Sequence, residues 1–203
     1  MPLLVATGNP GKLREFRALL APVEIAAPGE LGLDLRVEEK GRSFAENAAL
    51  KARAFALTSG LICLADDSGL EVGALGGAPG ILSARYGGPH LDDAGRCRLL
   101  LDQLRAFPDP AQRRARFCCV LVAWAPDGRT CQAEGFCEGQ IALAPAGEEG
   151  FGYDPIFWVP EYRQTVAQLP AVVKNSISHR AQALRALRPL LLKTFPELES
   201  PLS

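Results

Sequence analysis

The sequence predicts an α/β fold, and three observations carry this prediction. A short apolar run, Leu3–Ala6, is followed by a loop rich in glycine and then by apolar residues at helical spacing. Further apolar segments alternate with helical ones, which favours an α/β over an all-β architecture. The 203 residues are 48% hydrophobic and 22% charged, which is typical of a globular chain with a sizeable core. Because no repeat, low-complexity segment or linker interrupts the chain, we expect one domain over residues 1–203.

Turn and capping residues set the bounds of the elements expected in the first half of the chain. The segment Gly8–Gly11 ends the first strand, and Pro22 ends the helix that follows it. Ser43 and Glu46 form a capping box, in which each side chain binds a free amide at a helix start, and Gly60 stops that helix. The expected elements are a strand at 3–6, a helix from 12 to 20, a strand at 23–27, a helix from 43 to 58 and a buried strand at 61–65.

The second half of the chain has fewer but longer expected elements. Asp92 is a typical N-cap residue, and the segment Pro126–Gly128 is typical of a hairpin turn between two strands. Ala181, Leu184 and Leu187 have the spacing of an apolar helix face. The expected elements are a helix from 92 to 106, strands at 115–125 and 129–137, and a helix from 178 to 193.

The charge balance limits the class of partner. Lys and Arg number 22 against 23 Asp and Glu, which gives a net charge of −1. A chain without a bulk positive field is not expected to bind a nucleic-acid polymer, although a local cluster of donors can still bind a small phosphorylated ligand. The longest apolar run, Phe117–Ala125, has nine residues, whereas a membrane span needs about 20. We therefore expect neither a nucleic-acid polymer nor a membrane as partner.

Targeting signals and cysteines both predict a cytoplasmic protein. No basic residue precedes Lys12 and no long apolar segment opens the chain, so we expect no secretory signal. The six cysteines are expected to be free, buried thiols in a reducing cytosol, because a chain of this size does not need disulfides. They also lack the Cys/His spacing of a zinc site.

The loop Thr7–Lys12 combines a helix N-terminus with a lysine, which is a pattern that can bind an anion. It is not a P-loop, because only two residues separate its glycines and Leu13 follows the lysine. The dinucleotide fingerprint is also absent, since Pro155 stands where Gly150–Gly152 would need a third glycine. The alternative is a tight turn whose lysine points to solvent.

Asp66 and Asp67 follow the strand expected at 61–65, at the end where open α/β sheets bind their ligands. Adjacent strand residues face opposite sides, so one of the two is expected to enter a site. Magnesium is the natural ion for such carboxylates, with Glu38, Glu39 and Glu46 as further candidate ligands. The alternative is that Asp66–Gly69 forms a solvated turn.

Two later segments carry further candidate ligands. The segment Phe151–Asp154 offers an aromatic face suited to stacking on a planar base, with an aromatic plug of the core as the alternative. Lys174, His179 and Arg180 bring donors to the start of the last helix, although His179 could equally have no chemical role. Only two histidines are present and no nucleophile elbow exists, so a Ser/His/Asp hydrolase is not supported.

Five segments in order together resemble a known family: LLVATGNPGKLREF, GRSFAENAALKARA, LADDSGLEVGALGGAPGILSARYGG, GFGYDPIF and SISHRAQAL. Across nearly its whole length the chain is similar to the inosine/xanthosine triphosphate pyrophosphatases. The resemblance implies an elongated mixed twisted sheet with flanking helices, two lobes around a central cleft, and a homodimer. It also implies Mg²⁺-dependent hydrolysis of ITP, dITP and XTP to the monophosphate and pyrophosphate, which cleanses the nucleotide pool.

The resemblance assigns roles to individual residues. Glu39 and Asp67 are expected to bind Mg²⁺, and Asp67 is also expected to be catalytic as the proton acceptor. Ser68 is expected to contact the substrate. The other expected substrate-binding residues are Thr7, Gly8, Asn9, Pro10, Gly11 and Lys12 for the triphosphate, Phe151, Gly152, Tyr153, Asp154 and Lys174 for the nucleoside, and His179 and Arg180 for the base.

Two positions depart from the pattern of the family. Lys40 stands where a small hydroxyl residue is expected, and it could add positive charge near the phosphates. The segment Pro170–Val173 replaces a more acidic approach to Lys174. Neither departure touches the carboxylates.

The expected reaction begins with attack of water on the α-phosphorus. Pyrophosphate then leaves, with its charge neutralised by Lys12 and the loop amides. Two other hypotheses stay open: a non-catalytic nucleotide-binding or sensor module, and a related α/β pyrophosphatase that acts on modified pyrimidine or canonical nucleotides.

Overall fold

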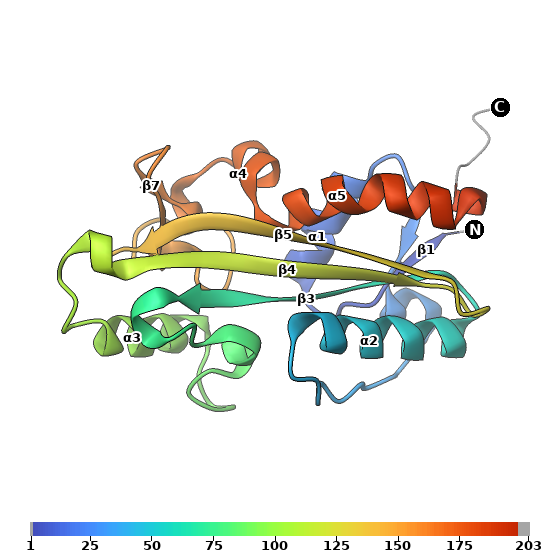
Figure 1. The fold of residues 1–203 in the computed structure, drawn as a ribbon, viewed down its shortest axis with the longest axis horizontal. Helices are drawn as coiled ribbons and strands as arrows, with labels where there is room; N and C mark the ends of the chain where they lie inside the picture. The colour runs from blue at the N-terminus through green and yellow to red at the C-terminus, as the bar shows by residue number, and fades with distance from the viewer. Residues whose placement is uncertain (1, 199–203) are drawn as a thin grey trace. The chain divides into compact units, whose positions relative to one another are not determined.

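The computed structural model describes residues 2–198, which form a mixed, seven-stranded sheet flanked by helices (Figure 1). The strands are β1 (Leu3–Val5), β2 (Ile25–Ala26), β3 (Cys63–Val72), β4 (Arg114–Trp124), β5 (Thr130–Ile141), β6 (Phe157–Val159) and β7 (Gln164–Thr165). The helices are α1 (Pro10–Leu20), α2 (Phe44–Ser59), α3 (Asp93–Gln103), α4 (Ala171–Ile177) and α5 (His179–Thr194). The strand order is β2-β1-β3-β4-β5-β6-β7. Parallel pairing of β1 with β2 and β3, and antiparallel pairing of β6 with β5 and β7, confirm the predicted mixed α/β sheet.

The chain folds into two compact units, each with its own apolar core. Unit 1 contains the chain up to Asp67, the segment Cys119–Gly135 and the chain from His179 on. Unit 2 contains Ser68–Cys118 and Phe136–Ser178. The boundaries fall within β3, β4 and β5, so each of these strands contributes residues to both units.

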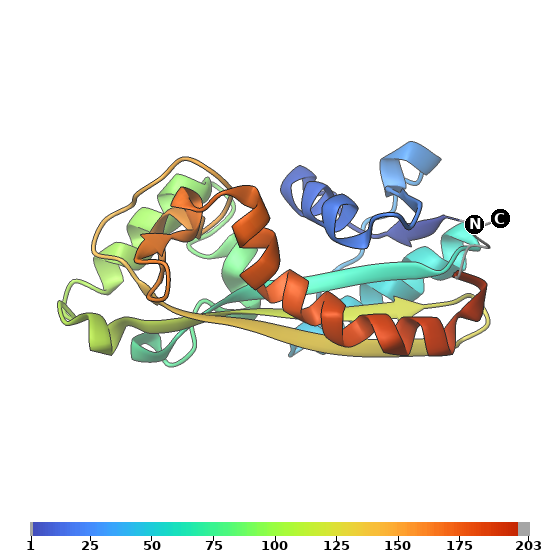
Figure 2. The same cartoon turned by 90° about the horizontal axis from the view of Figure 1, so that it is seen from above.

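In unit 1, α5 and α2 cover opposite faces of the sheet (Figures 1 and 2). The core on the α5 face includes Leu64 of β3, Phe16 of α1 and Leu187 of α5, all fully buried. Gly135 of β5 lies against the backbone of α5, where a Cβ would come within 2.2 Å of the Ala183 nitrogen. A glycine is required there because any side chain would separate the strand from the helix.

The core of unit 2 packs α3 against the segment that leads into β6. Leu100 of α3 and Leu104, which follows the helix, share this core with Ile156 and Phe157. Arg113 is buried beside it, with only 2% of its surface exposed. Its guanidinium donates hydrogen bonds to four carbonyl oxygens, those of Leu104, Phe107, Ile141 and Ala142, at 2.7–3.1 Å. The side chain therefore ties the end of α3 to the end of β5.

The structure extends two strands beyond their predicted ends. The strand expected at 61–65 continues to Val72, and the one expected at 129–137 continues to Ile141. The alternative that Asp66–Gly69 is a solvated turn is therefore wrong, as is the placement of Asp66 and Asp67 at a strand end. Both carboxylates lie within β3, where cationic side chains compensate their burial.

The other expected elements are present with bounds that differ by a few residues. Asn9, Ser43 and Asp92 cap α1, α2 and α3, and Gly60 ends α2 with a left-handed conformation. Strands β6 and β7 and helix α4 have no counterpart in the predicted elements. All six cysteines are free, and all but the half-buried Cys131 are buried. Within residues 2–198, every helix is too short or too polar to cross a membrane.

Candidate active site

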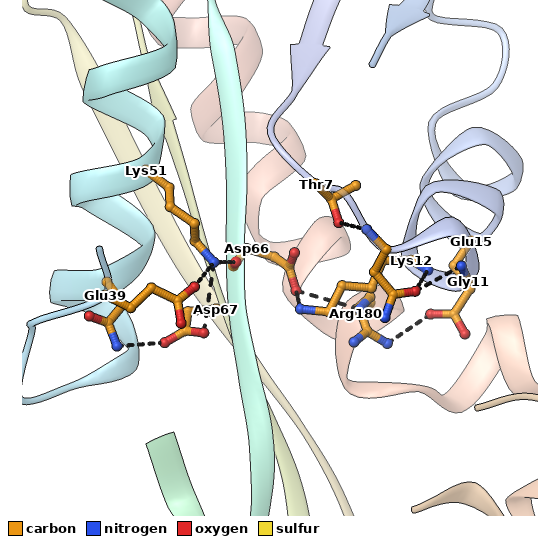
Figure 3. A network of polar contacts seen from close by, with 11 residues as sticks. Thr7, Gly11, Lys12, Glu15, Glu39, Lys51, Asp66, Asp67 and Arg180 are labelled. Carbon is orange, nitrogen blue, oxygen red and sulfur yellow. Dashed lines mark hydrogen bonds and ion pairs between the residues drawn. The ribbon is translucent and has the colours of Figure 1, made fainter. Parts of the chain in front are cut away.

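Strand β3 presents two adjacent carboxylates on its opposite faces (Figure 3). Asp66 faces α1 and α5, where it contacts Lys12 and Arg180. Asp67 faces α2, where it contacts Asn47 and Lys51. The exposed fractions are only 2% for Asp66 and 7% for Asp67. Side chains alternate along a strand, so the prediction that the two carboxylates part is confirmed.

Asp66 belongs to a buried network of two acidic and two basic side chains. Its Oδ2 atom lies 2.7 Å from Lys12 Nζ and 3.7 Å from Arg180 Nε. Arg180 also donates from Nη1 to Glu15 Oε2 at 2.8 Å. Burial alone would raise the pKa of Asp66, but the charges of Lys12 and Arg180 hold it well below its usual range. Asp66 therefore stays ionised and acts as the counter-ion of both cations.

Asp67 has a different environment because its nearest charged neighbour is farther away. Asn47 Nδ2 donates to Asp67 Oδ2 at 3.0 Å, while Lys51 Nζ lies 3.8 Å from Oδ1. Burial raises the pKa of Asp67 above its ordinary value, although Lys51 and the Asn47 hydrogen bond act in the opposite direction. A carboxylate with a raised pKa on a buried face is suited to accept a proton.

The ammonium group of Lys51 lies among three oxygen atoms of this face. Lys51 Nζ donates to Glu39 Oε1 at 2.8 Å and to the Asp66 carbonyl oxygen at 2.6 Å, in addition to its contact with Asp67. Burial would lower the pKa of Lys51, but Asp66, Asp67 and Glu39 raise it, so the group stays protonated. Glu39, which precedes α2, is thus brought to the same face as Asp67.

The carboxylate oxygens around Lys51 are of the chemical type that binds magnesium in nucleotide sites. Between residues 2 and 198, no three side chains of His, Cys, Asp or Glu form a closed metal site. Mg²⁺ in nucleotide sites is commonly held by one or two carboxylates, with phosphate oxygens and water completing its shell. Glu39 and Asp67 provide two such carboxylates, and both lie around the Lys51 ammonium.

The structure separates the other glutamate candidates from this face. Glu38 forms an ion pair with Lys40, and both side chains are exposed. Glu46 accepts a hydrogen bond from the Arg42 amide at 2.7 Å, while its own amide donates to Ser43 Oγ at 3.2 Å. Glu46 therefore serves the start of α2, with Arg42 in place of the Ser43 amide that the capping box predicts.

In the segment Thr7–Lys12, four backbone amides are already engaged, among them that of Thr7, which donates to the Val5 carbonyl oxygen. Asn9 Oδ1 accepts from the amides of Gly11 and Lys12 at 2.8 and 3.1 Å, and the Asn9 amide donates to Thr7 Oγ1 at 3.2 Å. The helix begins at Pro10, and asparagine is a strong N-cap. The Lys12 ammonium is thus the main positive group that this segment offers to an anion.

The turn Phe151–Asp154 in unit 2 is built around a buried carboxylate. Asp154 Oδ2 accepts from the Phe151 amide at 2.9 Å and from Lys174 Nζ at 2.6 Å. Gly150 has a φ of +84°, and a Cβ there would lie 2.1 Å from Asp154 Oδ2, so a side chain at this position would break the turn. Lys174 Nζ lies 4.7 Å from the centre of the Phe151 ring.

The two aromatic residues of this turn have different environments. Tyr153 is buried in the core of unit 2, and its hydroxyl donates to the Ser83 carbonyl at 2.9 Å. Phe151 is half-buried and lies beside Lys174. Phe151 is therefore the ring that this turn can offer to a planar base.

The remaining predicted residues lie at the unit boundaries along the chain. Ser68 is the first residue of unit 2 and is half-buried. His179 is the first residue of α5 and is buried, next to Arg180 of the Asp66 network.

Sequence reasoning missed Glu15, Asn47 and Lys51 as part of the site. For each of these three residues, the spacing along its helix could have indicated a role in the site. Glu15 follows Lys12 by one helical turn, and Asn47 and Lys51 stand four residues apart on a helix whose buried residues are otherwise apolar. Polar residues at helical spacing on a buried face need partners, so they point to a polar site.

Comparison with known proteins shows that the chain matches one protein family and is similar to several curated proteins. The Ham1 family matches residues 3–190. A dITP/XTP pyrophosphatase from Desulforamulus reducens is 48% identical over 197 residues, which cover 96% of this chain and 98% of that protein. A dITP/XTP pyrophosphatase from Bacillus subtilis is 45% identical over 190 residues, which cover 93% and 96%.

Solved structures of similar proteins have a fold that superposes on this one. The Ham1 protein of Staphylococcus aureus superposes with a TM-score of 0.83 at 42% identity, over 94% of this chain and 98% of that one. A nucleoside-triphosphatase / dITP/XTP pyrophosphatase from Mycobacterium abscessus superposes with a TM-score of 0.74 at 44% identity, over 93% and 100%.

Proposed function

Because this chain belongs to the Ham1 family, we propose that it removes non-canonical purine nucleotides such as ITP, dITP and XTP from the nucleotide pool. The protein is a nucleoside triphosphate pyrophosphatase, a hydrolase that releases the monophosphate and pyrophosphate. The observation that carries the assignment of its site is the pair of buried carboxylates on opposite faces of β3. Asp66 has cationic partners, for which it is the counter-ion. Asp67 has a raised pKa and lies beside Glu39 and Lys51.

Asp67 is the residue that we assign to proton transfer. Water attacks the α-phosphorus, the bond from that phosphorus to the α–β bridging oxygen breaks, and the proton of the water passes to Asp67 Oδ1 or Oδ2. The raised pKa of Asp67 supports this role, because a general base works best when its pKa approaches the working pH. Asn47 holds the carboxylate in place through its amide.

Glu39 and Asp67 are the residues that would hold Mg²⁺. When bound, the ion polarises phosphate oxygens and lowers the pKa of a bound water. Lys51 contacts both carboxylates, and it contributes a positive charge beside them. Glu39 has a half-buried side chain on the segment that precedes α2.

Lys12 is the residue that we assign to the outer phosphates, together with the loop Thr7–Gly11. Asp66 holds the Lys12 ammonium at 2.7 Å in a buried network that also includes Arg180, so the cation is positioned before substrate binds. Preorganised charge of this kind stabilises a leaving pyrophosphate without a reorganisation cost. Two amides of the loop are bound by the Asn9 side chain. Lys12 therefore neutralises more of the charge of the leaving pyrophosphate than the sequence alone predicts.

The nucleoside is assigned to the turn Phe151–Asp154 with Lys174, and the base edge to His179 and Arg180. The half-buried ring of Phe151 supports stacking, and the buried Asp154–Lys174 pair supports a rigid turn beside it. Ser68 is assigned to substrate contact. A base with a 6-amino group would leave buried donors unpaired, so the site would favour 6-oxo purines.

The proposal includes three statements about the whole protein. Residues 1–203 act as one functional domain, two chains form a homodimer, and the enzyme works in the cytoplasm. The family resemblance supports the homodimer, and the six free cysteines support a reducing compartment.

A substrate panel with resolved products tests this function. ITP, dITP, XTP, GTP, ATP and a modified pyrimidine triphosphate are each incubated with and without Mg²⁺, and pyrophosphate and orthophosphate are measured separately. We expect pyrophosphate from ITP, dITP and XTP only when Mg²⁺ is present. Equal turnover of GTP and ITP would favour a pyrophosphatase for canonical nucleotides. Binding of ITP without any release of pyrophosphate would favour a sensor module.

A further inference from the structure

The turn that carries Phe151 is bound to helix α3 through the two backbone polar groups of a single residue, Gly152. The Gly152 amide donates to Asp93 Oδ2 at 2.8 Å, and the Cys97 thiol donates to the Gly152 carbonyl oxygen at 3.4 Å. All of these residues belong to unit 2. Both polar groups of one residue are therefore bound by side chains of one helix.

The spacing of the two side chains explains how one helix can do this. Asp93 and Cys97 are four residues apart, so they project from the same face of α3 on consecutive turns. Gly152 has a φ of +63°, and the direction in which a Cβ would project is open for 4 Å. Side-chain packing does not fix this residue, and so the two hydrogen bonds set the position of its peptide groups.

The chemistry of each group suits its role. Asp93 is exposed and accepts at the first turn of α3, where a carboxylate is stabilised by the helix dipole. Cys97 is buried, and burial together with Asp93 and Asp154 raises the pKa of its thiol to about 12. The thiol therefore keeps its proton at neutral pH and can donate it to a carbonyl oxygen.

We propose that Asp93 and Cys97 are positioning residues that clamp Gly152 and so fix the Phe151 ring for the nucleoside end of the substrate. This inference rests on the proposed nucleoside-binding role of the turn. The clamp touches no phosphate-binding residue, and its contacts stay within unit 2. Loss of the clamp should weaken nucleoside recognition and leave both the chemical step and the binding of a bare polyphosphate unchanged.

The test compares Asp93→Ala with Asp93→Asn, which keeps an accepting oxygen, and with Asp102→Ala. Asp102 is a matched control, because it is also exposed on α3 and also forms an ion pair with an arginine three residues along. For each variant, KM and kcat for ITP are measured by pyrophosphate release, and inorganic tripolyphosphate is measured as a competitive inhibitor. We expect Asp93→Ala to raise KM about fivefold to tenfold, as for one lost hydrogen bond, with kcat and the inhibition constant within about twofold of wild type.

Asp93→Asn should restore KM to within about threefold of wild type, and Asp102→Ala should not change it. Amide hydrogen exchange of a peptide containing Gly152 gives a readout independent of activity, and exchange should become faster in Asp93→Ala alone. Unchanged KM and unchanged exchange in Asp93→Ala would overturn the clamp. Equal losses for ITP and tripolyphosphate would also overturn it, because they indicate a general structural defect. Absence of pyrophosphate release by the wild-type enzyme would overturn the proposed function instead.

Discussion

At the scale of single residues, the chemistry of this protein depends on how two neighbouring aspartates differ. Asp66 lies close to Lys12 and Arg180 and has a lowered pKa, whereas Asp67 forms its ion pair with Lys51 at the longer distance of 3.8 Å and has a raised pKa. The sequence shows that the pair must part across the strand, because alternation is local. It does not show which aspartate meets which cations, since Lys12, Lys51 and Arg180 come from three separate helices.

Replacement of Asp67 tests the role of the second aspartate. We expect Asp67→Asn to lower kcat for ITP by about 10²- to 10⁴-fold, because an amide cannot accept the proton of the attacking water. The melting temperature should stay close to that of wild type, since asparagine can still accept from Asn47 and removes a buried charge. Glu71→Gln is the control, because it makes the same chemical change on the same strand in an exposed ion pair with Arg116. Near-normal kcat in Asp67→Asn would show that another group accepts the proton.

Replacement of Lys12 tests the assignment of the outer phosphates. Lys12→Ala should raise the dissociation constant of tripolyphosphate about tenfold or more, because a charge-assisted contact with phosphate is lost. Binding of inosine, which carries no phosphate, should change by less than about twofold, and isothermal titration measures both ligands. Lys40→Ala is the control, because its ammonium is exposed and paired with Glu38. If inosine and tripolyphosphate weakened by the same factor, the phosphate role of Lys12 would be wrong.

At the scale of elements, the helix caps could be predicted from the sequence. The contacts with distant segments that allow a strand to continue could not. Ser43, Gly60 and Asp92 define the ends of their helices in the structure, because a cap involves only residues within one turn. The continuation of β3 beyond Ala65 depends on distant cations that let two carboxylates be buried, so no local signal announces it. Strands β6 and β7 have three and two residues, too few for a period of two to be recognised.

Arg113 provides a test of how two of these elements are held together. Its guanidinium satisfies four carbonyl oxygens at the ends of α3 and β5. Arg113→Ala would leave these buried acceptors without their donor, and we expect it to lower the free energy of unfolding by about 3 kcal/mol. Denaturant unfolding followed by circular dichroism measures this change. The neighbouring Arg114 is exposed, so Arg114→Ala should change stability by less than about 0.5 kcal/mol. Equal effects of the two changes would contradict the role of Arg113.

At the scale of the whole molecule, the sequence was sufficient for the class of the fold and for six cysteines that are not joined in disulfides. A mixed sheet with flanking helices and six free cysteines are both present. Two lobes were expected only from the family resemblance, because no linker or change of composition marks the division into two compact units inside three continuous strands. Compactness of this kind arises from contacts between segments that are far apart in the chain.

Thiol reactivity reports on the integrity of the whole fold. Burial raises the pKa of Cys63 and of Cys97 to about 12, and Cys131 is the one cysteine that is half-buried rather than buried. We expect Ellman's reagent at pH 8 to modify Cys131 first in the native protein, with the other five reacting only on unfolding. Mass spectrometry after partial labelling identifies the site. Six thiols should react in denaturant without a reductant, and a smaller number would reveal a disulfide.

The phosphorus atom that water attacks decides whether the proposed reaction is right. Hydrolysis of ITP in water enriched with ¹⁸O, followed by mass spectrometry of the products, locates the new oxygen atom directly. Attack at the α-phosphorus predicts one ¹⁸O atom in the inosine monophosphate and none in the pyrophosphate. Label in the pyrophosphate, or orthophosphate as the first product, would contradict the mechanism.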